Sequence, residues 1–173
     1  MTHMWKWALP AVFGSVLLAA CGGDDSGTAP ASTFKKAVEQ LETTGQLPVL
    51  DRESSLAGLD SNGNGVRDDI ERYVDGKSGT QSQKSSLKSL SAALTQAMLA
   101  DLEDANALRE ATNAINLAVT CVWRNHASGE ASPAVHEIEK ITVNTRARYE
   151  AYMKFNSAMN GSVVKSAKEV NCG

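Results

Sequence analysis

The sequence is poor in the residues and motifs on which most enzymes depend. It has only three histidines, and it contains no G-x-S-x-G, no H-E-x-x-H and no glycine-rich phosphate loop. Its formal net charge is −3, with no block of like charge, which argues against a nucleic-acid-binding surface. No apolar run reaches the roughly 18 residues of a membrane-spanning helix. We therefore predict a protein that is not an enzyme and has no nucleic-acid partner.

Residues 1–20 have the pattern of an export signal. Lys6 precedes an apolar run over residues 8–20, and that run ends in Leu18-Ala19-Ala20-Cys21. This tetrapeptide resembles the lipobox of bacterial lipoproteins. The resemblance implies cleavage before Cys21, acylation of Cys21 and attachment to a membrane through the N-terminal lipid. An ordinary secretory peptide with a chance cysteine is the alternative.

Two further features concern the region after the anchor. In lipoproteins of this kind, an aspartate directly after the cysteine favours retention in the inner membrane; here that residue is Gly22, so the resemblance implies the outer membrane. The side of the membrane that the protein faces, periplasmic or external, stays open. Residues 21–32 are rich in Gly, Ser, Ala, Asp and Thr, which predicts a flexible tether. Residues 33–173 are then long enough for one domain with its own core.

Two cysteines, Cys121 and Cys172, remain for the folded domain. In an oxidising compartment such a pair favours a disulfide over a metal site. Two free thiols, or a link to another chain, are the alternatives. An internal bond would join the end of the chain to a central helix.

The most informative segment is residues 60–71, whose sequence is DSNGNGVRDDIE. It fits the pattern D-x-[DN]-x-[DN]-G-x5-E, which supplies oxygen ligands at the spacing of a Ca²⁺-binding loop. An Asn-Gly-Asn-Gly turn that leads into an acid-capped helix, without a metal, is the alternative interpretation.

This segment resembles the calcium loop of the EF-hand family. The resemblance implies that Ca²⁺ is held by the side chains or backbone of six residues, with Gly65 as the turn glycine and Glu71 closing the cage with both oxygens: Asp60, Asn62, Asn64, Val66, Asp68 and Glu71. Arg67 stands where the family has an aliphatic residue that pairs with a second loop, and the sequence has no second loop. Residues 50–59 form a weak helix at best. We therefore expect a solitary loop followed by one helix, with weak affinity for Ca²⁺.

Apolar residues at helical spacing predict an all-α bundle. Helices are expected over 33–41 and 68–74, around Leu87–Met98 and Leu108–Val122, and over about 25 residues from Ser132-Pro133 to Met159, with a short segment over 163–170. The apolar face of the first helix is formed by Phe34, Val38 and Leu41. Trp123 is expected to pack in the core around the disulfide.

Other residue groups are weaker candidates for a site. His126 and His136, with Glu130, Glu137 or Glu139, could form a transition-metal patch, but histidines beside a turn are more often solvated. Tyr149 and Tyr152 with Arg146 and Arg148 could line a groove, although we expect the tyrosines at the edge of the core and the arginines in solvent.

Two function classes follow. The first is a cell-envelope lipoprotein in which a calcium loop stabilises a helical binding or scaffolding module, with another envelope protein as a possible partner. The second is an inhibitor or immunity lipoprotein that blocks an envelope enzyme. A fold by itself permits both.

Overall fold

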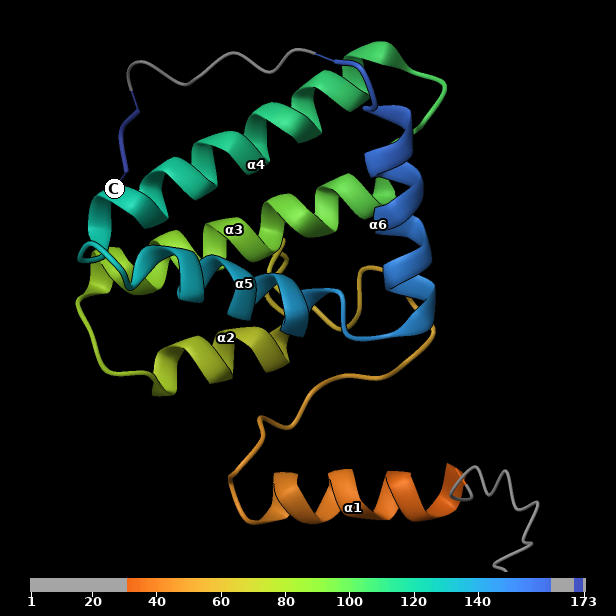
Figure 1. Ribbon diagram of the computed structural model, residues 1–173, viewed down its shortest axis with the longest axis vertical. Helices are drawn as coiled ribbons and strands as arrows, with labels where there is room; N and C mark the ends of the chain where they lie inside the picture. The colour runs from red at the N-terminus through yellow and green to blue at the C-terminus, as the bar shows by residue number, and fades with distance from the viewer. Residues whose placement is uncertain (1–30, 163–169, 173) are drawn as a thin grey trace, which may run out of the picture.

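The computed structural model describes residues 31–162 and 170–172. Within these residues the chain forms helices and no strand, which confirms the predicted all-α bundle (Figure 1). None of these helices is long and apolar enough to cross a membrane. Several predicted segments lie outside the described residues: the leader, Cys21, residues 22–30 of the tether, and residues 163–169 of the predicted short segment. The helices are α1 (Ala31–Thr43), α2 (Asp68–Gly76), α3 (Gln81–Leu99), α4 (Ala105–Asn125), α5 (Ala131–Thr142) and α6 (Arg146–Ala158).

Helix α3 is the centre of the bundle, because α2, α4, α5 and α6 all pack against it (Figure 1). A capping box at Thr80 and Gln83 starts this helix. The main core joins side chains of α2, α3, α4 and α5, among them Ile70, Val74, Leu87, Leu90, Leu94, Val122 and Ile138. A smaller cluster of Ala97, Ala111 and Phe155 lies where α6 meets the bundle.

The predicted helix from residue 132 to residue 159 is wrong, because the chain breaks into α5 and α6 at Val143, Asn144 and Thr145. Thr145 caps α6 by accepting a hydrogen bond from the backbone N–H of Arg148. Asn144 leaves the helical path and donates to the backbone carbonyl of Asp51 at 2.8 Å. Polar and β-branched residues at the break favour caps over a helix interior, so side-chain contacts replace the continuous ladder of backbone hydrogen bonds.

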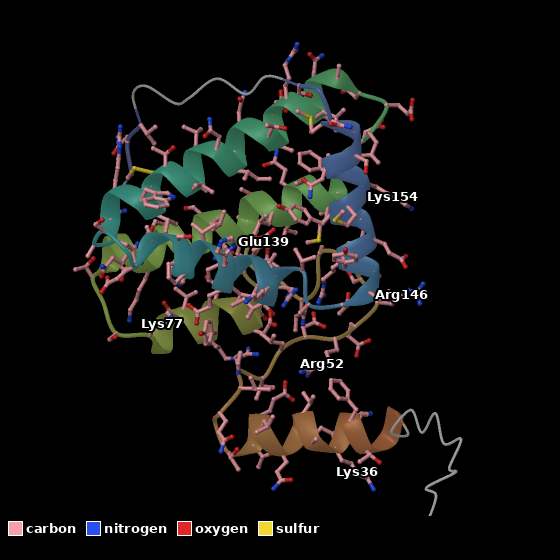
Figure 2. The ribbon with its side chains drawn as sticks, in the orientation of Figure 1. Lys36, Arg52, Lys77, Glu139, Arg146 and Lys154 are labelled. Atoms are coloured by element: carbon pink, nitrogen blue, oxygen red, sulfur yellow. A yellow bond between two sulfur atoms is a disulfide. The ribbon has the colours of Figure 1, made fainter. Side chains whose placement is uncertain are left out.

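Helix α1 stands apart from the other helices (Figure 1). It starts at Ala31, two residues earlier than predicted, and Gly45 (φ +72°) follows its end. Its apolar face does not enter the core, since Phe34 is 72% exposed. Arg52 lies between α1 and the bundle and donates to the Glu42 carboxylate at 2.6 Å (Figure 2).

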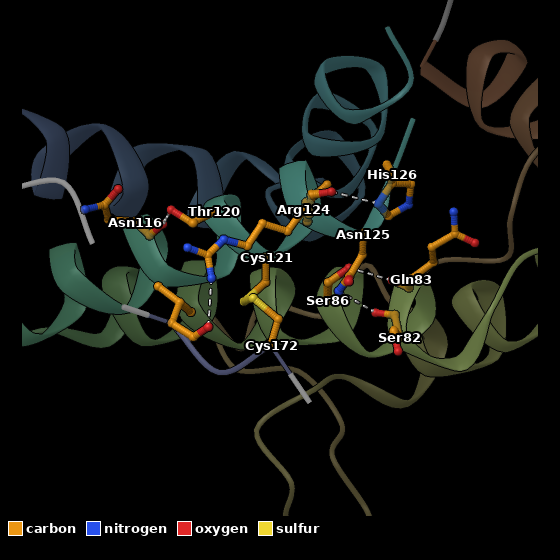
Figure 3. The surroundings of a disulfide bond; sticks show 12 residues. Ser82, Gln83, Ser86, Asn116, Thr120, Cys121, Arg124, Asn125, His126 and Cys172 are labelled. Carbon is orange, nitrogen blue, oxygen red and sulfur yellow. Dashed lines mark hydrogen bonds between the residues drawn. A yellow bond between two sulfur atoms is a disulfide. The ribbon is translucent and has the colours of Figure 1, made fainter. Parts of the chain in front are cut away.

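Cys121 and Cys172 form a disulfide, with their Cα atoms 5.3 Å apart (Figure 3). The bond holds the end of the chain against α4, where Arg124 also donates to the carbonyl of Val170 at 2.8 Å. Trp123 does not pack in the core as predicted, because it is 53% exposed. Cys121 and Val122 take the inward positions on this turn of α4, which leaves Trp123 on the outer face.

Candidate functional site

The predicted calcium loop, residues 60–71, begins in an irregular segment and ends within the first turn of α2. The backbone N–H of Asp68 donates to the carbonyl of Leu59 at 2.8 Å and closes the base of the loop. Val66 and Ile70 are buried in the main core. The exit side of the loop is therefore fixed to the bundle, and no helix precedes the loop in residues 50–59, as the sequence indicated.

Asp60, at the first position, is the residue around which the loop turns. Its Oδ1 accepts from the backbone N–H groups of Gly63 (2.9 Å) and Asn64 (3.2 Å), and its Oδ2 accepts from that of Gly65 (2.8 Å). Gly65 has φ +83°, which is the left-handed conformation expected for the turn glycine. The backbone thus curls toward one carboxylate, which brings the following positions close together.

Asn62, Asn64 and Glu71 converge on one another. The Asn62 Nδ2 donates to Glu71 Oε2 at 2.9 Å, and the Asn64 Nδ2 donates to Glu71 Oε1 at 2.7 Å. Their amide oxygens accept from the backbone N–H groups of Asn64 and Val66. The third, fifth and twelfth positions of the loop therefore meet in space.

Asp68, at the ninth position, contacts the entry of the loop. Its carboxylate accepts from the hydroxyl of Ser61 at 2.6 Å and from the backbone N–H of Ser61 at 2.9 Å. These two hydrogen bonds lower the pKa of Asp68, because they favour the ionised carboxylate. The contact with Ser61 thus keeps Asp68 anionic at the entry of the loop.

The chemistry of the donor set fits a hard cation. Carboxylates, side-chain amide oxygens and a backbone carbonyl are the ligands that Ca²⁺ prefers. Ligation would require the Asn62 and Asn64 amides to turn their oxygens inward, away from the backbone N–H groups that they now accept from. Among the described residues, no three His, Cys, Asp or Glu side chains gather as a metal site, so the candidate depends on amide and backbone oxygens as well as acids.

Lys88 of α3 adds a cation to this site. Its Nζ lies 3.6 Å from Glu71 Oε1 and 2.9 Å from Asp75 Oδ1. Burial lowers the pKa of Lys88, but its hydrogen bond and attraction to Asp75 and its attraction to Glu71 outweigh burial and raise it above its ordinary value. The ammonium therefore stays charged at neutral pH.

Arg67 anchors the loop to the rest of the bundle, a role that the sequence did not reveal. Its guanidinium is buried and binds both oxygens of Asp69, at 2.7 and 2.8 Å. The same guanidinium donates to the carbonyls of Ile141 and Thr142 at the end of α5, each at 3.0 Å. Burial raises the pKa of Asp69, but the hydrogen bonds from Arg67 and from the backbone N–H of Asp51, with the charge of Arg67, outweigh burial and leave the pKa lowered.

Arg148 is the second buried arginine, which contradicts the expectation that it is solvated. Its guanidinium holds the segment before the loop by donating to the carbonyls of Asp51 (2.7 Å), Ser55 (2.9 Å) and Leu56 (3.2 Å). Arg146, by contrast, points outward from α6, as expected (Figure 2). Tyr149 is exposed and Tyr152 is partly buried.

The two histidines make separate local contacts. His126 Nδ1 lies 3.0 Å from the carbonyl of Val122, and His136 Nδ1 lies 3.6 Å from Glu139 Oε2 (the first contact is drawn in Figure 3). Glu137 instead binds Tyr73 and the Nζ of Lys77, at 2.8 Å from the latter. The described residues therefore do not assemble the transition-metal patch.

A groove of about 990 Å³ lies between α3 and α4. Alanines such as Ala92, Ala107 and Ala114 line it, and Leu99 and Leu117 line it as exposed leucines. The lining is mostly apolar, with Asp101 and Glu110 as its charged residues.

No protein-family model, curated protein or solved structure matches the chain.

Proposed function

We propose that this protein is a cell-envelope lipoprotein, anchored to the outer membrane through Cys21, in which a solitary calcium loop stabilises a helical binding or scaffolding module. The export signal and lipobox support the anchor. The arrangement of the loop supports the cation site. The α3–α4 groove offers a surface for a partner in the envelope, and it fits the alternative role as an inhibitor of an envelope enzyme equally well.

The convergence of Asn62, Asn64 and Glu71 around a turn built on Asp60 is the observation that carries this proposal. When bound, Ca²⁺ would offset two of the three negative charges of Asp60, Asp68 and Glu71, and it would join the entry of the loop to α2. Asp60, Asn62, Asn64, Asp68 and Glu71 would hold it with their side chains, and Val66 with its carbonyl. Because Val66 and Ile70 are core residues, a firmer loop would strengthen the attachment of α2 to the bundle.

Replacing Glu71 by glutamine is expected to weaken Ca²⁺ binding at least about tenfold, since it removes the charge of the residue that closes the cage. The unchanged protein should bind Ca²⁺ with a dissociation constant of roughly 0.1–1 mM, the range of extracellular modules. Isothermal titration calorimetry measures both values. At ten times the dissociation constant, Ca²⁺ should add about 1.4 kcal/mol to the free energy of unfolding.

Glu103→Gln is the matched control, because Glu103 is an exposed acid in the connection between α3 and α4. This variant should bind Ca²⁺ like the unchanged protein. A calorimetric titration without any heat of binding at millimolar Ca²⁺ would remove the cation from the proposed function.

Replacing Cys21 by serine is expected to move the protein from the membrane fraction to the soluble fraction. Acyl chains contribute about 0.8 kcal/mol per buried CH₂, and the described residues contain no membrane-spanning helix to substitute for them. Fractionation of the envelope, with mass spectrometry of the N-terminal peptide, checks this result. Gly22→Asp serves as the control, since it keeps the acylated cysteine and should change only the membrane in which the protein resides. A Cys21→Ser protein that stays in the membrane fraction would contradict lipid anchoring.

A further inference from the structure

Lys88 reaches the calcium loop from a different helix. Glu71 and Asp75 lie four residues apart on α2 and so share one face of that helix. The Nζ of Lys88 lies between them, 3.6 Å from Glu71 Oε1 and 2.9–3.0 Å from the two oxygens of Asp75. Two acids thus share one ammonium, and only one of them, Glu71, belongs to the loop.

Glu71 already has positively polarised groups on both of its oxygens. Besides Lys88, the amide groups of Asn62 and Asn64 donate to Oε2 and Oε1. A bound cation would require the same two oxygens. The amides can exchange by rotation, because each also carries an oxygen ligand, whereas an ammonium has no acceptor and can only repel a cation.

We propose that Lys88 is a built-in competitor of the cation at the loop of residues 60–71, and that Asp75 moderates the competition by holding the ammonium away from Glu71. This inference rests on the proposed calcium site. The distances support it, since Lys88 makes its hydrogen bond to Asp75 and only a longer ion-pair contact to Glu71. When Glu71 turns to the cation, Asp75 remains as the partner of Lys88.

The proposal predicts opposite effects for the two partners of one ion pair. Lys88→Met should tighten Ca²⁺ binding about tenfold, because it removes a positive charge beside a divalent ion. Asp75→Asn should weaken binding several-fold, since the freed ammonium then turns to Glu71. In the Lys88→Met background, Asp75→Asn should have a much smaller effect, because only the loss of a nearby negative charge remains. Calorimetry with CaCl₂ on the full chain measures all four proteins.

Lys84→Met is the matched control. Lys84 lies one turn earlier on α3 and donates to the backbone carbonyl of Asp75 at 2.8 Å, and among the described residues it makes no hydrogen bond or ion pair with a loop ligand. The Lys84→Met variant tests the loss of a lysine charge that contacts only the backbone of α2. We expect a change in affinity of less than about twofold.

The outcomes separate this inference from the proposed function. If the unchanged protein binds Ca²⁺ and Lys88→Met binds it equally, or if Lys84→Met has the same effect as Lys88→Met, the competition is overturned and the calcium site stands. Binding that becomes measurable only in Lys88→Met would support the competition and would, at the same time, remove Ca²⁺ from the proposed function of the unchanged protein. If neither protein binds Ca²⁺, both the competition and the calcium site are overturned. An equal effect of Asp75→Asn in both backgrounds would overturn the role of Asp75.

Discussion

Replacing Arg67 by methionine is expected to destabilise the protein by about 3–5 kcal/mol. Methionine retains much of the volume but none of the donors. The change would leave the Asp69 carboxylate buried without its cation, and the carbonyls of Ile141 and Thr142 without the hydrogen bonds they now accept from Arg67. Urea unfolding, followed by circular dichroism at neutral pH, measures the loss.

Two variants make this result specific. Arg146→Met removes an exposed arginine of α6 and should leave the unfolding midpoint unchanged. Asp69→Asn should cost much less in the Arg67→Met background than in the unchanged protein, because the uncompensated buried charge is then gone. If Arg67→Met unfolds at the same urea concentration as Arg146→Met, the anchoring role of Arg67 is wrong.

The position of Arg67 also bears on how the proposed calcium loop is held in place without a second loop. Its backbone lies between Val66 and Asp68, which are both predicted ligands. Its side chain is fixed at the break between α5 and α6 by the carbonyls of Ile141 and Thr142. In the EF-hand family, which the loop resembles, a sister loop steadies the calcium loop, whereas the support found in this protein is the buried guanidinium of Arg67. Arg67, which departs from the pattern that the loop resembles, therefore connects the loop to the bundle together with the core residues Val66 and Ile70.

The sequence predicted the helices whose apolar periodicity is regular and local. Leu87, Leu90 and Leu94 mark the buried face of α3, and Ala111, Ala118 and Val122 mark that of α4. It did not predict the break at Asn144, because two of the groups that bind Asn144 there come from Asp51 and Arg67, which are far away along the chain. Local spacing carries no information about such partners.

The candidate site also combines local contacts, which the sequence could indicate, with distant contacts, which it could not. Every hydrogen bond among Asp60, Asn62, Asn64 and Glu71 joins residues of one short segment, so a motif could indicate the arrangement. The burial of Arg67 and Arg148 could not be predicted, because arginine side chains are rarely fully buried and are therefore expected in solvent. Lys88 belongs to a helix predicted only as part of the core, and nothing in its spacing relates it to Glu71.

Removal of the disulfide is the second change for which we expect a large effect. Cys121 and Cys172 are separated by 51 residues, and closing a loop of that size in the unfolded chain contributes up to about 4 kcal/mol in the chain-entropy description. The double variant Cys121→Ala/Cys172→Ala should therefore unfold at a much lower urea concentration. Replacing both cysteines avoids leaving a free thiol that could link two chains.

A reductant provides the control, because it should lower the unfolding midpoint of the unchanged protein toward that of the double variant and leave the double variant unaffected.

The result bears on where the protein works. Disulfides persist in the periplasm and at the cell surface and are rare in the cytosol, so a chain that loses about 4 kcal/mol on reduction reaches its full stability only outside the cytoplasm. Dependence on the bond between Cys121 and Cys172 would agree with export through a lipobox leader. A midpoint that reductant does not change would show that the bond contributes little and would remove this independent support for the envelope.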